Sequence, residues 1–330
     1  MDFDLNDEQK QIRQVAHDLL AARSPFAKVR QAAEAGEYDV SLWSELVELG
    51  WPGIAVAAER GGQGLGAVEL SVLLDELGYA CAATPFYSTA TAAAVIEAAG
   101  SDEQRRRWLP GLASGELTAG IGTRELAADA DAAAVIVLVE DEEATLLDRN
   151  QASVEPFVSI DPTRRFASVN GDGEPLGPGA VDRIRAALAA EVVGVCQRAL
   201  DMTLEYVKDR KQFGVPVGSF QAVSHRCAQM LMHTESGRSA AYFAAWAADA
   251  DPERLAEAAA LAAATAADGG REVTASAIQA HGGIGFTWEA DVHWLYKRAQ
   301  LDGVLLGGAR RHRAALARLG AARVSGVAAG

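Results

Sequence analysis

Nearly all of residues 181–320 carries apolar side chains at helical spacing, and short polar joins divide this stretch into several long segments. Ile184, Leu188 and Val195 fall on one face of the first segment, because an α-helix turns once in about 3.6 residues. Pro252 stands just after an aspartate, where a proline often opens a helix. Long amphipathic helices with short joins pack as an antiparallel bundle. We therefore expect a C-terminal four-helix bundle over residues 176–330.

The first 120 residues also read as helices. Asn6 with Gln9, and Ser101 with Gln104, have the spacing of a capping box, in which side chain and backbone bond reciprocally at a helix start. A helical N-terminal domain over residues 1–120 follows from these signals.

Residues 132–175 have a different pattern. The stretch "AAVIVLVEDEEATLLD" has two apolar runs around an acidic turn and predicts a hairpin, while "SVEPF" and "RFASV" predict further short strands. A sheet of about three strands would be only marginally stable by itself, so we expect it to pack against the helices. The predicted fold class is mainly α, with a reduced β domain over residues 121–175.

Charge and composition exclude several classes of protein. The 330-residue chain has a net charge of −15, which argues against general binding to nucleic acid or anionic membranes. The N-terminal residues lack the pattern of a signal peptide, and no apolar run has the length of a membrane span. Three cysteines without CxxC spacing are expected to be buried free thiols. We expect a cytoplasmic protein.

The stretch "QAHGGIGF", residues 279–286, follows a long alanine-rich segment. A glycine pair commonly ends a helix. Glycines also let backbone N–H groups approach a phosphate, since no Cβ stands in the way. The sequence leaves both readings open for the glycines themselves.

Two motifs together resemble the acyl-CoA dehydrogenase family: "DRKQFGVPVGSFQAVSH" and "QAHGGIGF". The resemblance extends to "ELGWPGIAVAAERGGQGLG", "WLPGLASGEL", "SIDPTRR" and "GVCQRALDMTLEYVKDRKQFG", in the family's order along the chain. It implies a flavoprotein that removes a proton and a hydride from the α and β carbons of an acyl-CoA thioester. It also implies FAD at a dimer interface, with electron-transfer flavoprotein as electron acceptor.

The resemblance assigns cofactor contacts to positions that face a neighbouring subunit. These positions are Arg210, Gln212, Phe213, Gln221, Gln279, Gly282 and Gly283. The chemistry agrees, because the guanidinium of Arg210 can donate two hydrogen bonds to phosphate oxygens. His281 is expected to be a helix-end or cofactor-contacting group rather than a base.

The chain departs from the family at its own flavin site. The motifs that cradle the flavin ring and the acyl-CoA are missing between "LTAGIGTRE" and the later strands, and the β segment contains no tryptophan. The reaction needs a carboxylate to remove the α proton. The two positions where family members carry it are Leu306 and Ile184 here.

Glu191 is a weak candidate for a replacement base. It lies about two helical turns beyond Ile184 on the same face. The interpretation we favour is a buried or interface ion pair with an arginine such as Arg185 or Arg198, since a charge in apolar surroundings needs a partner. Asp302 and Asp291 are expected to be solvated. No metal site is expected, because Glu-x-x-His pairs are absent from the sequence.

The combination resembles the shortened subunit of actinobacterial heteromeric, sterol side-chain type, acyl-CoA dehydrogenases. There a longer subunit carries the base and the flavin cradle, and a heterotetramer is expected. Two alternatives stay open. The chain could be a homodimeric dehydrogenase that uses Glu191, or a non-enzymatic acyl-CoA-binding or structural partner.

Overall fold

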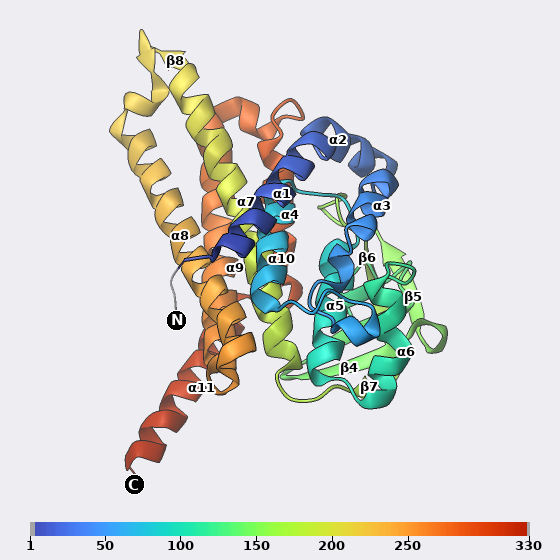
Figure 1. The fold of residues 1–330 in the computed structure, drawn as a ribbon. Coiled ribbons are helices and arrows are strands. Elements are labelled where there is room, and N and C mark those ends of the chain that lie inside the picture. Colours follow the sequence, from blue (N-terminus) through green and yellow to red (C-terminus); the bar gives the residue numbers. More distant parts are fainter. Residues whose placement is uncertain (1–3, 329–330) are drawn as a thin grey trace.

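The computed structural model describes residues 4–328, which form a helical N-terminal part, a sheet and a C-terminal helical part (Figure 1). The N-terminal helices are α1 (Asp7–Arg23), α2 (Phe26–Ala35), α3 (Val40–Glu48), α4 (Ala67–Tyr79), α5 (Phe86–Ala99) and α6 (Asp102–Ala113). Both predicted capping boxes are present, at the starts of α1 and α6.

Seven strands lie between the two helical parts, rather than about three. They are β1 (Ala119–Gly122), β2 (Ala127–Ala128), β3 (Val135–Glu140), β4 (Glu143–Asp148), β5 (Ser153–Phe157), β6 (Phe166–Asn170) and β7 (Glu174–Pro175). The order in the sheet is β5-β6-β2-β1-β3-β4-β7. Only the β1–β3 pair is parallel among the pairings of the described residues. The predicted β3–β4 hairpin and strands β5 and β6 are confirmed.

The interior strand β3 is buried on both faces, which explains its continuous apolar run. Val135, Val137 and Val139 belong to the main core that the sheet shares with the helices. Ile136 and Leu138 point to the opposite face, where they join a smaller apolar cluster. The sheet therefore leans on the helices through one face, as the sequence predicts.

The C-terminal helices are α7 (Ala180–Asp209), α8 (Gln221–Ala250), α9 (Leu255–His281), α10 (Val292–Leu305) and α11 (Gly308–Ala328). Helix α9 contacts α7, α8, α10 and α11, and therefore lies at the centre of this part (Figure 1). The fold class is confirmed: a mainly helical protein with a small sheet and a C-terminal helical bundle. The domain boundaries at residues 120 and 175 stay predictions.

Helices α4 and α7 touch backbone to backbone, which fixes the N-terminal part against the bundle. A Cβ on Gly194 would lie 1.8 Å from the carbonyl oxygen of Asp75, and a Cβ on Gly78 would lie 2.1 Å from that of Glu191. No larger residue fits at either glycine without moving a helix. This contact sets the position of Glu191 in the interior.

Two further expectations concern the cysteines and the membrane. Cys81, Cys196 and Cys227 are free and buried, as predicted. Within residues 4–328, no helix combines the length and the apolar character needed to cross a membrane.

Candidate functional site

A short hairpin connects α7 to α8 at one end of the bundle (Figure 1). Its strands are β8 (Lys211–Gln212) and β9 (Val215–Pro216), joined by Phe213 and Gly214. Both turn residues have positive φ, 53° and 83°, as the two-residue turn of a tight hairpin requires. Phenylalanine is rare in this conformation, and the Phe213 side chain is 94% exposed. The turn thus holds an aromatic ring out from the protein.

Polar side chains near this hairpin are exposed. Arg210 follows the last residue of α7, Gln212 lies in β8, and Gln221 opens α8. Within residues 4–328, no carboxylate forms an ion pair with Arg210. The N-terminus of α8 adds backbone N–H groups that no side chain caps. This end of the bundle can therefore receive an anion.

The end of α9 is attached to the same end of α7. The Tyr206 hydroxyl donates a 3.2 Å hydrogen bond to the carbonyl oxygen of His281, and the two rings stack with centroids 4.4 Å apart. The Nδ1 atom of His281 lies 2.8 Å from the carbonyl oxygen of Ala277, and burial lowers the pKa of this histidine. These contacts bring Gln279 and the glycines after it next to the hairpin segment. His281 therefore lies at a helix end, as expected.

The glycines of residues 282–286 have different roles. A Cβ on Gly285 would lie 2.5 Å from the carbonyl oxygen of Ile278, so this glycine is needed for packing. Gly282 has a φ of 66° and ends α9, but a Cβ on Gly282 or Gly283 would meet nothing within 4 Å. Their backbone is open to an incoming ligand. The stretch is thus both a helix end and an accessible backbone surface.

The hairpin segment and the residues that follow α9 both carry exposed aromatic rings. Phe213 and Phe220 meet edge to face with centroids 6.3 Å apart. Phe286 and Trp288 are 78% and 71% exposed. Exposed aromatic residues gathered at one place are typical of a surface that another molecule covers.

A cluster of buried charges lies on the other side of the core, between the sheet and the bundle. Arg298 of α10 is 1% exposed. It donates to Asp161 at 2.7 Å, to Glu191 at 2.8 Å and to the Thr163 hydroxyl at 2.6 Å. Asp161 and Thr163 come from the connection between β5 and β6, so the cluster joins the β segment to α7 and α10.

Arg164 is the second arginine of this group of buried charges. We call the group the ionic cluster; it consists of Asp161, Arg164, Glu191, Arg298 and Asp302. It forms an ion pair with Glu191 and donates to Asp302 at 2.6 Å, and its guanidinium lies 4.7 Å from the centre of the Tyr87 ring. One oxygen of Glu191 and one of Asp302 have no hydrogen-bond partner. Burial raises the pKa of Asp302 to about 7, and the charge of Arg164 opposes this rise.

Three expectations about these acids need correction. Glu191 is buried and ion-paired as predicted, but its partners are Arg164 and Arg298, and not Arg185 or Arg198. Asp302 was expected to be solvated and is 3% exposed, because it pairs with the buried Arg164.

Asp291 was also expected to be solvated. It is partly buried and forms a bidentate ion pair with Arg30 of α2, at 2.6 and 2.8 Å. The sequence signal for this cluster was the motif "SIDPTRR", which contains Asp161, Thr163 and Arg164.

The two positions that the family resemblance assigns to the base are apolar and buried. Ile184 of α7 is 0% exposed, and Leu306 after α10 is 4% exposed. Both belong to the main core. Glu191, the candidate replacement base, instead shares one carboxylate oxygen between the guanidinium groups of Arg164 and Arg298.

Side chains that commonly bind metals are not grouped within the described part of the chain. Across residues 4–328 no group of three His, Cys, Asp or Glu side chains could hold a metal ion. His293 packs against the rings of Trp288 and Trp294, and burial lowers its pKa to about 4.

Comparison with known proteins identifies the family. Residues 6–116 match "Acyl-CoA dehydrogenase, N-terminal domain" and residues 172–320 match "Acyl-CoA dehydrogenase, C-terminal domain". The acyl-CoA dehydrogenase IpdE2 of Mycolicibacterium smegmatis is 35% identical over 311 residues, which cover 93% of this chain and 96% of that protein. IpdE2 of Mycobacterium tuberculosis is also 35% identical, with 92% and 94% coverage.

Solved structures agree. One titled "Tcur3481-Tcur3483 steroid ACAD G363A variant" superimposes with a TM-score of 0.86 at 27% identity, over 97% of this chain and 99% of that chain. The ChsE4-ChsE5 complex from Mycobacterium tuberculosis has a TM-score of 0.85 at 23% identity, over 96% and 98%, which shows a shared fold. The chain belongs to the acyl-CoA dehydrogenase family of FAD-dependent oxidoreductases.

Proposed function

We propose that this chain is the shortened subunit of a heteromeric acyl-CoA dehydrogenase. It supplies the neighbour-facing half of an FAD site to a longer subunit, which provides the catalytic base. The observation that carries the proposal is the replacement of both family base positions by buried apolar side chains, Ile184 and Leu306. Without a base the α proton of an acyl-CoA does not leave at a useful rate.

The bundle end suits the adenine and phosphate half of FAD. Arg210, which has no carboxylate partner within residues 4–328, can donate to a phosphate oxygen, and the open backbone at Gly282 and Gly283 can approach the same group. Gln212, Gln221 and Gln279 can bond to polar edges of the cofactor. Phe213 offers a ring that can pack on a flat group.

This chain is less suited to bind the isoalloxazine ring of FAD than its adenine and phosphate groups. Residues 119–175 contain no tryptophan to pack against the ring, and buried charges fill the space between the sheet and the bundle. Bound FAD supplies the hydride acceptor for α,β-dehydrogenation. The ring would lie in the partner subunit, so this chain's residues bind and orient the other half of the cofactor.

The names of similar proteins support the partner and the substrate class. The steroid ACAD structure at 27% identity carries two component names in its title. On that basis the partner is a longer acyl-CoA dehydrogenase subunit, the assembly a heterotetramer, and the substrate a sterol-type or fatty acyl-CoA. Electron-transfer flavoprotein would accept the electrons. A cytoplasmic location follows from this role.

Flavin content tests the proposal. The chain is purified alone and with a candidate longer subunit, and the flavin released by denaturation is measured. We expect little flavin from the chain alone and stoichiometric flavin from the complex. Stoichiometric flavin on the chain alone would contradict the proposal and favour a homodimeric dehydrogenase. A complex that forms without flavin would favour a non-enzymatic partner.

A further inference from the structure

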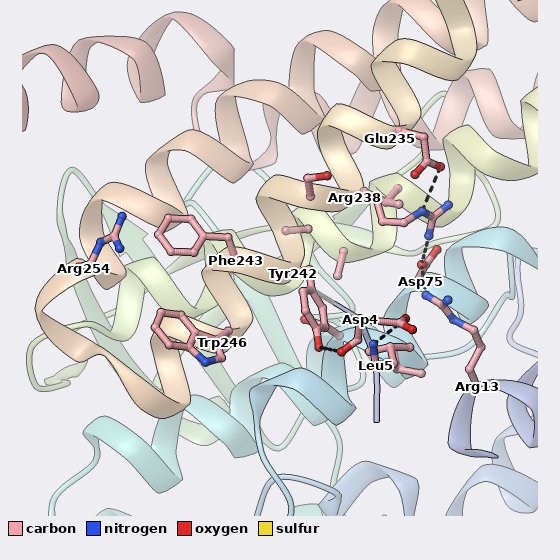
Figure 2. A pocket seen from close by; sticks show the side chains of 16 residues that line it. Asp4, Leu5, Arg13, Asp75, Glu235, Arg238, Tyr242, Phe243, Trp246 and Arg254 are labelled. Atoms are coloured by element: carbon pink, nitrogen blue, oxygen red, sulfur yellow. Dashed lines mark hydrogen bonds and ion pairs between the residues drawn. The ribbon is translucent and has the colours of Figure 1, made fainter. Parts of the chain in front are cut away.

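A cavity of about 600 Å³ lies between α1, α4, α7 and α8 (Figure 2). Residues 235–246 of α8 line it, whereas the proposed cofactor contact on the same helix, Gln221, lies near the opposite end. Ser71, Ala190 and Ala241 are small side chains that leave the space between the helices open. This volume is in the range of sites that hold small organic molecules. The cavity is therefore a separate candidate site.

An aromatic wall lines one side of the cavity. Tyr242, Phe243 and Trp246 all come from α8 and are partly buried. The rings of Phe243 and Trp246 are nearly parallel, with centroids 6.2 Å apart, and Figure 2 shows them side by side. An apolar ligand placed against this wall would remove aromatic surface from water.

The charges at the inner end of the cavity compensate one another. Asp75 of α4 forms ion pairs with Arg238 at 2.5 Å and with Arg13 at 3.3 Å (Figure 2). Arg238 also pairs with Glu235 at 3.3 Å. Two carboxylates and two guanidinium groups leave no net charge here.

Arg254 lies at the other end of the cavity (Figure 2). The third carboxylate of the lining, Asp4, pairs with Lys10 at 2.7 Å. Arg254 lies over the Phe243 ring at 4.8 Å and, within residues 4–328, forms no ion pair with a carboxylate. The cavity thus combines an apolar wall with one positive charge at its edge.

We propose that this cavity binds an amphipathic carboxylate. The apolar body lies against Tyr242, Phe243 and Trp246, and the carboxylate accepts hydrogen bonds from the Arg254 guanidinium. A charge-assisted pair of this kind fixes the direction in which the ligand enters. No bond is made or broken, so the site is one of binding only. It does not depend on the FAD half-site.

The test uses dodecanoate as probe, below its micelle concentration, with the full-length chain. Affinity is measured by titration calorimetry and by quenching of tryptophan fluorescence, since Trp246 lines the cavity. Two variants alter the site: Arg254→Gln removes the charge, and Ser239→Trp fills the space from the exposed side. Arg310→Gln is the matched control, because Arg310 is an exposed arginine on α11. Circular dichroism checks that each variant is folded.

We expect saturable binding of dodecanoate, weakened at least about tenfold by Arg254→Gln and by Ser239→Trp, and unchanged by Arg310→Gln. Dodecanol, which has the same chain without the charge, should bind more weakly than dodecanoate. Absence of saturable binding below about 1 mM would overturn the proposal. So would an affinity that neither Arg254→Gln nor Ser239→Trp changes.

Discussion

Glu191 of α7 and Arg298 of α10 form a 2.8 Å ion pair in the interior, with 3% and 2% of their side chains exposed. Asp161, from the connection between β5 and β6, accepts from the same arginine at 2.7 Å. One guanidinium therefore ties the β segment to two helices of the bundle. Glu191 therefore takes part in holding these segments together.

Replacing Arg298 should destabilise the fold strongly. Arg298→Met leaves Asp161 and Glu191 short of a partner, and breaking a buried ion pair costs about 3–5 kcal/mol. Urea unfolding of the variant measures the loss. The control is Arg311→Met, whose exposed pair with Asp141 should contribute less than about 1 kcal/mol. Equal losses in the two variants would mean that the ionic cluster adds nothing beyond a surface pair.

Arg210→Ala should weaken FAD binding in the reconstituted complex by about tenfold or more, since it removes a charge-assisted contact to phosphate. Flavin fluorescence during dilution of the complex reports the affinity. Arg310→Ala is the control, because Arg310 is an exposed arginine of α11 far along the chain from the hairpin. An unchanged FAD affinity in Arg210→Ala would mean that Arg210 does not contact the cofactor.

The two glycines of the proposed half-site should respond differently to alanine. Gly282→Ala places a Cβ at φ 66° and ψ −143°, a conformation that residues other than glycine rarely adopt, and this costs about 1–3 kcal/mol of stability. Gly283→Ala should leave the stability of the chain within about 0.5 kcal/mol, because its Cβ meets nothing within 4 Å. It should nevertheless weaken FAD binding in the complex, since the methyl group occupies the surface offered to the cofactor. Thermal unfolding and flavin fluorescence separate the two effects.

His312 should make stability depend on pH. Burial, followed by the charges of Arg185 and Arg311, lowers its pKa from 6.5 to about 4. A base with a lowered folded-state pKa contributes stability above its unfolded pKa, and this contribution is lost as the pH falls. Between pH 6.5 and 5 the loss is roughly 1.5 kcal/mol. Over the same pH range, the unfolding free energy of His312→Gln should fall by roughly 1.5 kcal/mol less than that of the unchanged protein. An identical fall in both proteins would mean that His312 does not cause this pH dependence.

Helices and strands could be predicted from the sequence where the signal for them lies within a few neighbouring residues. Capping pairs and helical spacing locate α1, α6 and the bundle, because these interactions span a few residues. Strands β1 and β2 were missed, since "AGIG" and a two-residue "AA" have no strand pattern of their own. They form because β3 and β6 offer open backbone partners on either side.

The ionic cluster shows the same limit for side chains. Arg164 and Glu191 are 27 residues apart, and Arg298 and Asp161 are 137 apart, so no spacing rule joins them. Asp302 reads as a solvated charge in "KRAQLDGV", but packing of α10 turns it inward to Arg164. The residues proposed to contact FAD come from motifs, and the structure adds the Tyr206–His281 contact that joins their two segments.

Acyl-CoA-dependent reduction of an electron acceptor shows whether this chain is catalytically incomplete by itself. It is measured for this chain alone with added FAD, for its complex with a longer subunit, and for the complex carrying Glu191→Gln in this chain. We predict no turnover by the chain alone and turnover by both assembled complexes, because the proposed base belongs to the partner. Turnover by the chain alone that Glu191→Gln abolishes, with FAD content intact, would contradict this prediction.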